Sequence, residues 1–239
     1  MTAYSKNIAE IADNYCDIIL VGDSLGMVLY GMKSTREVKI ETMLLHAKAV
    51  KNHTKKSLIV FDMPYKTYTS KSIAYKNAKK IMKITNCDAV KLEGGKKITG
   101  IIKHLTKKKI PVMGHIGLLP QTSINFKVKG KNSIQKEKIF KDAIAISKSG
   151  VFAIIIECVV EDLAKKITKT VTVPTIGIGA SKSCDGQILV TDDILGLSDL
   201  RPKFVKRYTN LKTLIEKSIK NYSRDVKMRR FPSNKNIYR

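Results

Sequence analysis

The chain has 239 residues and a formal net charge of +25, but its excess lysines are spread over every predicted helix and accompany no nucleic-acid-binding motif, so we expect no specific nucleic-acid partner. A hydrophobic fraction of 43% allows a packed core and excludes a disordered chain. Because no apolar stretch approaches the roughly 18 residues that cross a bilayer and the N-terminus lacks a secretory signal, we expect a cytoplasmic protein without a membrane partner.

Short apolar runs, each ending on or near a polar residue, recur along the chain and are separated by segments of helical length. Runs of this kind, bounded by Gly or Pro, are typical of buried parallel strands in βαβ units. In chain order, the predicted strands are Ile18–Ser24, Leu58–Pro64, Ala89–Gly95, Pro111–Gly117, Ala153–Val159 and Pro174–Ala180, with a further short strand at Gln187–Val190.

The segments between these strands have the apolar period of amphipathic helices. Met43, Ala47 and Val50, for example, fall on one face of a helix. From Phe204 onwards one more amphipathic helix is predicted, and the residues from about 222 to 239 are expected to form a loose basic tail. The helices predicted before it are Lys6–Tyr15, Glu41–Asn52, Ser70–Ile84, Ile98–Leu105, Ile134–Ser149, Asp162–Thr170 and a short one that runs toward Leu197.

This alternation of strands and helices predicts an α/β fold, namely a (β/α)8 TIM barrel, which typically needs about 250 residues. Seven strands can be recognised, and the eighth would have to lie at Met1–Tyr4. We therefore expect an N-terminally shortened barrel. No shift in composition and no linker indicates a second domain, so residues 1–239 are predicted to form one barrel domain with a C-terminal helix and tail.

Parallel strands in βαβ units place all their C-terminal ends on one face, where barrel enzymes build their sites. Three carboxylates there, Asp23, Asp62 and Glu93, would repel one another unless a cation lay between them, and Mg²⁺ prefers oxygen ligands. Helix capping or pairing with lysines is the alternative. The side chains expected at this face are Asp23, Asp62, Lys91, Glu93, His115 and Glu157.

The other three side chains suggest different roles. Lys91 projects to the same side as Glu93 and would bind either a substrate carboxylate or a buried carboxylate partner. Glu157 lies in the most apolar run, which would raise its pKa and suit a general base, although a structural pair with a lysine stays open. His115 would contact a substrate or serve only in packing.

Several strings of residues are more specific than this general pattern. The most specific are VGDSLGM (Val21–Met27) and GHIGLLPQ (Gly114–Gln121), followed by VKLEGG, IIECV and PTIGIGA. These strings follow one another along the chain in the family's order, and from Thr2 to Phe231 and Pro232 the chain resembles the ketopantoate hydroxymethyltransferase family.

The resemblance implies a Mg²⁺-dependent (β/α)8 barrel that assembles as a homo-oligomer, usually a decamer. It implies transfer of a hydroxymethyl group from 5,10-methylenetetrahydrofolate to 3-methyl-2-oxobutanoate, which gives 2-dehydropantoate in pantothenate biosynthesis. Asp23, Asp62 and Glu93 would hold the metal, and Glu157 would be the proton acceptor. The residues that would contact the keto acid are Asp23, Ser24, Asp62 and Lys91, with His115 at the edge of the same pocket.

The chain departs from the family pattern at three places: it starts at TAY (Thr2–Tyr4), the segment Ser123–Gly130 is shorter, and Ser181 replaces a usual glycine.

Two other functions remain open. A Mg²⁺-dependent carbon–carbon lyase of the isocitrate lyase and phosphoenolpyruvate mutase type would be expected to carry a reactive cysteine motif after a strand, and the sequence has none. A decayed, basic binding protein would show salt-sensitive RNA binding and no Mg²⁺-dependent turnover.

Overall fold

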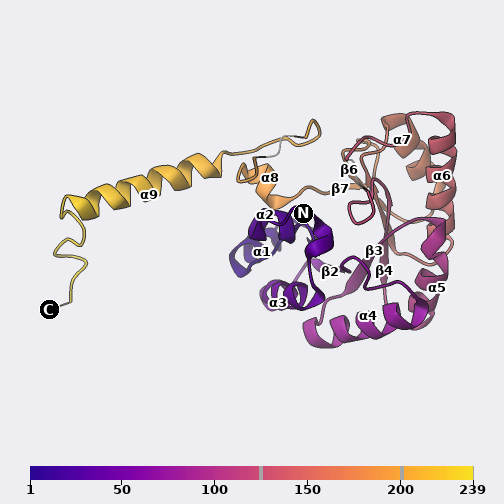
Figure 1. Ribbon diagram of the computed structural model, residues 1–239, viewed down its shortest axis with the longest axis horizontal. Helices are drawn as coiled ribbons and strands as arrows, with labels where there is room; N and C mark the ends of the chain where they lie inside the picture. Colours follow the sequence, from indigo (N-terminus) through magenta and orange to yellow (C-terminus); the bar gives the residue numbers. More distant parts are fainter. Residues whose placement is uncertain (124–125, 200–201, 239) are drawn as a thin grey trace. The chain divides into compact units, whose positions relative to one another are not determined.

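Seven parallel strands form one sheet whose spatial order follows the chain, from β1 to β7 (Figure 1). This computed structural model describes residues 1–123, 126–199 and 202–238. The first six strands lie within the predicted runs, whereas β7 is shorter than predicted and begins one residue earlier. The strands are β1 (Ile18–Val21), β2 (Leu58–Asp62), β3 (Ala89–Glu93), β4 (Val112–Gly117), β5 (Ala153–Glu157), β6 (Thr175–Ile178) and β7 (Gly186–Gln187).

Helices follow the strands in alternation and cover the outer face of the sheet, and Figure 1 shows α3 to α7 one after another around it. Each predicted helix before residue 171 is formed. Two elements between β1 and α3 were not predicted, the helix α2 (Leu25–Tyr30) and the 3-10 turn η1 (Thr35–Glu37). The others are α1 (Lys6–Ala12), α3 (Ile40–Lys51), α4 (Lys71–Thr85), η2 (Lys96–Ile98), α5 (Thr99–Lys107), α6 (Ser133–Ser147) and α7 (Glu161–Thr170).

Side chains alternate between the two faces of each strand, as the pleat of a sheet requires. On β2, Ile59 and Phe61 belong to the core shared with the helices, whereas Val60 belongs to a separate apolar cluster on the inner face. The inner cluster consists of Leu20, Val60, Ala89, Met113, Ala153, Ile155 and Ile188. The same alternation of side chains continues toward the C-terminal end of each strand. There, the residues that face inward are polar.

The N-terminal segment runs beside β1. The N–H of Leu20 donates to the carbonyl of Met1 at 3.0 Å, and the N–H of Ala3 donates to the carbonyl of Leu20 at 3.1 Å. On the other side, the N–H of Thr2 donates to the carbonyl of Leu189 at 3.3 Å. Because α1 begins directly after Ser5, this segment forms a single bridge to β1 rather than the predicted eighth strand. Among the described residues the sheet is therefore a curled, seven-stranded one.

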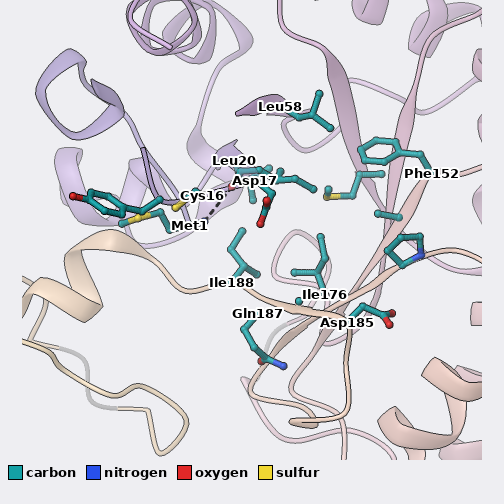
Figure 2. A pocket seen from close by; sticks show the side chains of 16 residues that line it. Met1, Cys16, Asp17, Leu20, Leu58, Phe152, Ile176, Asp185, Gln187 and Ile188 are labelled. Carbon is teal, nitrogen blue, oxygen red and sulfur yellow. Dashed lines mark hydrogen bonds between the residues drawn. The ribbon is translucent and has the colours of Figure 1, made fainter. Parts of the chain in front are cut away.

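A cavity of about 460 Å³ lies at the N-terminal ends of the strands. Figure 2 shows Leu20, Leu58, Phe152 and Ile176 around it, with Asp185 near its rim. None of the predicted site residues lines this cavity. The candidate chemistry is therefore at the opposite ends of the same strands.

The described residues divide into two compact units, Met1–Val190 and Thr191–Arg239. All strands belong to the first, and the prediction of one domain for residues 1–239 stays a prediction. The second contains α8 (Thr191–Leu195) and α9 (Leu211–Lys227), which has no buried residue. α9 continues to Lys227, past the predicted start of the tail at about 222, and the loose basic tail stays a prediction.

Some sequence predictions fall on residues outside the described ranges. Ile124 and Asn125 of the shortened segment are such residues. In the described part of the chain, no helix has both the length and the apolar character needed to cross a membrane.

Candidate active site

The strand register brings the predicted residues together at the C-terminal ends of the strands. Asp62 on β2 lies opposite Lys91 on β3, and Glu93 lies opposite His115 on β4. Glu157, at the end of β5, lies opposite Gly117. Side chains alternate between the two faces of a strand, and each of these residues falls at a position that faces inward. Their side chains therefore form one polar row above the apolar inner cluster.

Lys91 is at the centre of this row and is almost completely buried. Its Nζ donates to Oδ1 and Oδ2 of Asp62 at 2.7 and 2.8 Å, and to Oε1 of Glu93 at 3.4 Å. Burial alone would lower the pKa of Lys91, but the two carboxylates raise it above its usual value, so the ammonium stays charged. Lys91 also lowers the pKa of Glu93 against the effect of burial. The sequence had left open whether Lys91 pairs with a carboxylate, and the structure shows this pairing.

Asp23 joins the row from the turn after β1. Its backbone N–H donates to Oδ2 of Asp62 at 3.4 Å, which brings the ends of β1 and β2 together. Burial, followed by the negative charge of Asp62, raises the pKa of Asp23 well above its usual value. Burial likewise raises the pKa of Asp62, although Lys91 opposes the shift. These two buried carboxylates therefore lack sufficient positive charge around them.

His115 connects this acidic group with Glu157. Its Nδ1 is 3.6 Å from Oε1 of Glu93, and its Nε2 is 3.3 Å from Oε2 of Glu157. Burial and Lys91 would lower the pKa of His115, but Glu157 and Glu93 raise it to about 9. Neither ring nitrogen has a partner with hydrogen-bond geometry among the described residues. The ring is therefore held between two carboxylates by charge, and its predicted contact with a substrate stays a prediction.

The backbone around Glu157 explains part of the GHIG string. Gly117 has a φ of 92°, and a Cβ at this position would lie 2.3 Å from the carbonyl oxygen of Glu157. Only glycine therefore fits beside this strand end. The Glu157 side chain is 16% exposed, more than the apolar run around it suggests, because the strand ends there. The carboxylate is thus accessible from the inner face.

Ser24 follows Asp23 directly and precedes α2. Its Oγ is 2.7 Å from the hydroxyl oxygen of Tyr4, so the N-terminal segment contacts the same turn. The predicted role of Ser24 in binding the substrate carboxylate stays a prediction.

The sequence as a whole matches a known family. The sequence model described as ketopantoate hydroxymethyltransferase matches residues 1–234. The chain belongs to this family. The 3-methyl-2-oxobutanoate hydroxymethyltransferase of Pelagibacter ubique is 54% identical, and the alignment covers 100% of this chain and 93% of that protein. The enzyme of the same name from Rhizobium etli is 49% identical, with 98% and 87% covered. The resemblance predicted from the motifs is confirmed.

Solved structures share the fold of this ketopantoate hydroxymethyltransferase family member. Phosphonopyruvate hydrolase in complex with oxalate and Mg²⁺ has a TM-score of 0.62 at 14% identity, covering 99% of this chain and 87% of that chain. A 2,3-dimethylmalate lyase has a TM-score of 0.55 at 11% identity, covering 74% and 64%. Identities this low show the fold alone. The lyase alternative is not favoured, because relatives about half identical to this chain are hydroxymethyltransferases.

The donor atoms of this ketopantoate hydroxymethyltransferase family site fit a hard divalent cation. Among the described residues, no three acidic, histidine or cysteine side chains already surround one point as a metal cage. Mg²⁺, however, usually takes one or two protein carboxylates and completes its shell with water and substrate. Asp23 and Asp62 are neighbouring buried carboxylates with raised pKa values, and a cation would relieve their repulsion. Glu93, two residues from Lys91, belongs to the same group.

Two residues of the site were missed in the sequence. Gln121, on the loop between β4 and α6, is 1% exposed and hydrogen-bonds to Asp23 and Glu93. It ends the specific string GHIGLLPQ, which was a signal, but the string alone gave it no role. Tyr68, after β2, hydrogen-bonds to Gln121, and nothing in its local sequence indicated this contact.

Proposed function

We propose that this chain transfers a hydroxymethyl group to 3-methyl-2-oxobutanoate and forms 2-dehydropantoate, a step of pantothenate biosynthesis. The observation that carries the proposal is the row of polar side chains on the inner face, in which Glu157 and His115 adjoin the group formed by Asp62, Lys91 and Glu93. The names of relatives at 54% and 49% identity support it. The complete row also supports an active enzyme over a decayed binding protein.

In this proposal Asp23, Asp62 and Glu93 would hold Mg²⁺, which would polarise the keto group of the substrate and acidify its C3 hydrogen. Glu157 removes that proton, since its carboxylate is accessible at the end of β5. His115, 3.3 Å from Glu157, orients the carboxylate. Ser24 orients the substrate carboxylate, and Lys91, whose Nζ already donates to Asp62 and Glu93, attracts it by its positive charge.

Proton removal gives the enolate of the keto acid. Its C3 then forms a bond to the methylene carbon of 5,10-methylenetetrahydrofolate, and both bonds from that carbon to the two folate nitrogens break. One water molecule supplies the new hydroxyl group and one proton to the folate, and the proton removed from C3 supplies the other. The products are 2-dehydropantoate and tetrahydrofolate. The folate co-substrate, a homo-oligomer of decamer type and a cytoplasmic location are further parts of the proposal that rest on the family.

The same proposal includes a closed (β/α)8 barrel. Its support is the segment Met1–Ala3, which hydrogen-bonds to Leu20 of β1 on one side and to Leu189, just beyond β7, on the other. This segment bridges the two edges of the sheet, which is the place where an eighth strand would lie. The TM-score of 0.62 to the Mg²⁺-containing hydrolase is consistent with this arrangement.

Hydrogen exchange at C3 tests the proposed function without the folate donor. The protein is incubated in D₂O with 3-methyl-2-oxobutanoate and Mg²⁺, and the C3 proton signal is followed by NMR. We expect the signal to disappear with time, to persist when a chelator is added, and to disappear again when excess Mg²⁺ is restored. Exchange that continues unchanged in the chelator, or no exchange with Mg²⁺ present, would contradict the proposal.

A further inference from the structure

Gln121 has every polar atom of its side chain in use. Its Nε2 donates to Oδ2 of Asp23 at 2.8 Å and to the carbonyl of Met63 at 2.9 Å, while its Oε1 accepts from the hydroxyl of Tyr68 at 2.5 Å. The opposite orientation of the amide would place its oxygen against a carboxylate and a carbonyl. The contacts therefore fix one orientation, with the N–H groups toward Asp23.

The backbone of Gln121 holds a second carboxylate. Its N–H donates to Oε2 of Glu93 at 3.1 Å. One residue thus contacts acidic side chains from the ends of β1 and β3, which are 98 and 28 positions away in the sequence. Gln121 engages Oδ2 of Asp23 and Oε2 of Glu93, and Oε1 of Glu93 accepts from Lys91 at 3.4 Å, so Oδ1 of Asp23 is the more open position for a further ligand.

The loop that carries Gln121 is itself held in place. Arg36 in η1 donates from Nε to the carbonyl of Gln121 at 2.8 Å and from Nη2 to the carbonyl of Ser123 at 3.3 Å. A capping box between Ser34 and Glu37 fixes the turn on which Arg36 lies. Contacts from both sides therefore leave the Gln121 side chain little freedom to move.

We propose that Gln121 is a positioning residue that holds the carboxylates of Asp23 and Glu93 in the orientation that a divalent cation requires, with Tyr68 fixing its amide. The inference rests on the proposed function, because it takes these carboxylates as cation ligands. Without the amide, the negative charge of Asp62 would repel the carboxylates of Asp23 and Glu93, and these side chains would move away from it. Partners that orient metal ligands typically change metal affinity by about 10- to 100-fold when they are removed.

Binding of Mn²⁺, measured by the electron paramagnetic resonance signal of the free ion, tests this inference without a turnover assay. We expect Gln121→Leu to weaken Mn²⁺ binding by about 10- to 100-fold. Tyr68→Phe removes only the hydroxyl that fixes the amide, so it should weaken binding less but measurably. At saturating Mg²⁺, the C3 exchange rate of both variants should return to within about threefold of the unsubstituted rate, since the cation itself then orders the carboxylates.

Gln135→Leu is the matched control. The Oε1 of Gln135 accepts from the backbone N–H of Gly130 at 3.0 Å, so this side chain also stabilises the β4–α6 connection, without a contact to Asp23 or Glu93. We expect its Mn²⁺ affinity to be unchanged. Unchanged affinity in Gln121→Leu and Tyr68→Phe, or an equal loss in Gln135→Leu, would overturn the inference. Absence of Mg²⁺-dependent exchange in the unsubstituted protein would instead overturn the proposed function, while the Mn²⁺ titration would still decide the role of Gln121.

Discussion

Replacing Glu157 with glutamine is expected to slow the exchange of the C3 hydrogen of 3-methyl-2-oxobutanoate by about 10²- to 10⁴-fold, the contribution typical of a general base. Glutamine keeps the size of the side chain but cannot accept the proton. The fold should tolerate the change, because the Glu157 side chain is 16% exposed and its charged contact is with His115 alone among the described residues. The measurement is the exchange rate in D₂O at saturating Mg²⁺.

A second glutamate close in the sequence provides the control. Glu161, at the start of α7, accepts a hydrogen bond from Ser181 at 3.0 Å and has no contact with the polar row. Glu161→Gln should therefore keep the exchange rate of the unsubstituted protein. If Glu157→Gln exchanged the C3 hydrogen at the full rate, Glu157 would not be the proton acceptor.

Replacing Lys91 with methionine is expected to lower the free energy of unfolding of the metal-free protein by about 3 to 5 kcal/mol, as removal of one member of a buried ion pair does. The Nζ of Lys91 lies 2.7 Å from Asp62, and the two side chains are only 4% and 3% exposed. Without it, Asp62 and Glu93 would be buried next to Asp23 with no neutralising ammonium. Urea denaturation in the presence of a chelator measures the loss.

Lys51→Met is the matched control for this loss. Lys51 pairs with Asp88 at 2.7 Å, but these side chains are 24% and 33% exposed, so water screens the pair and its removal should cost about 1 kcal/mol or less. Mg²⁺ should stabilise every protein that keeps the cation site, but it should narrow the stability difference from the unsubstituted protein only for Lys91→Met, where it replaces a lost positive charge, and leave that difference unchanged for Lys51→Met. Equal losses in the two variants would show that Lys91 does not neutralise a buried acidic group.

The sequence was sufficient to predict which residues at the strand ends meet in the site. Asp62, Glu93 and Glu157 each end an apolar run, and parallel strands with helical crossovers leave all such ends on one face. Residues two positions apart on a strand point to the same face of the sheet, which is why Lys91 and Glu93 were expected side by side. The structure confirms that these residues come together, while their catalytic and metal-binding roles stay predictions.

Features that depend on distant contacts could not be predicted in the same way. The segment of α2 is an apolar run without a polar face, so its periodicity did not indicate a helix. β7 pairs with β6 at only two positions, Ile176 with Gly186 and Gly177 with Gln187, which its sequence did not indicate. Gln121 and Tyr68 acquire their roles from partners as far as 98 and 53 positions away, which local patterns do not reveal.

Location of a bound ion tests the central claim most directly, which is that Asp23, Asp62 and Glu93 serve one divalent cation at the C-terminal ends of the strands. Crystals grown with Mn²⁺ and 3-methyl-2-oxobutanoate give an anomalous signal that marks the ion independently of its surroundings. We predict one strong peak at this group of carboxylates, next to the keto acid. A peak elsewhere, or none at these three side chains, would contradict the account.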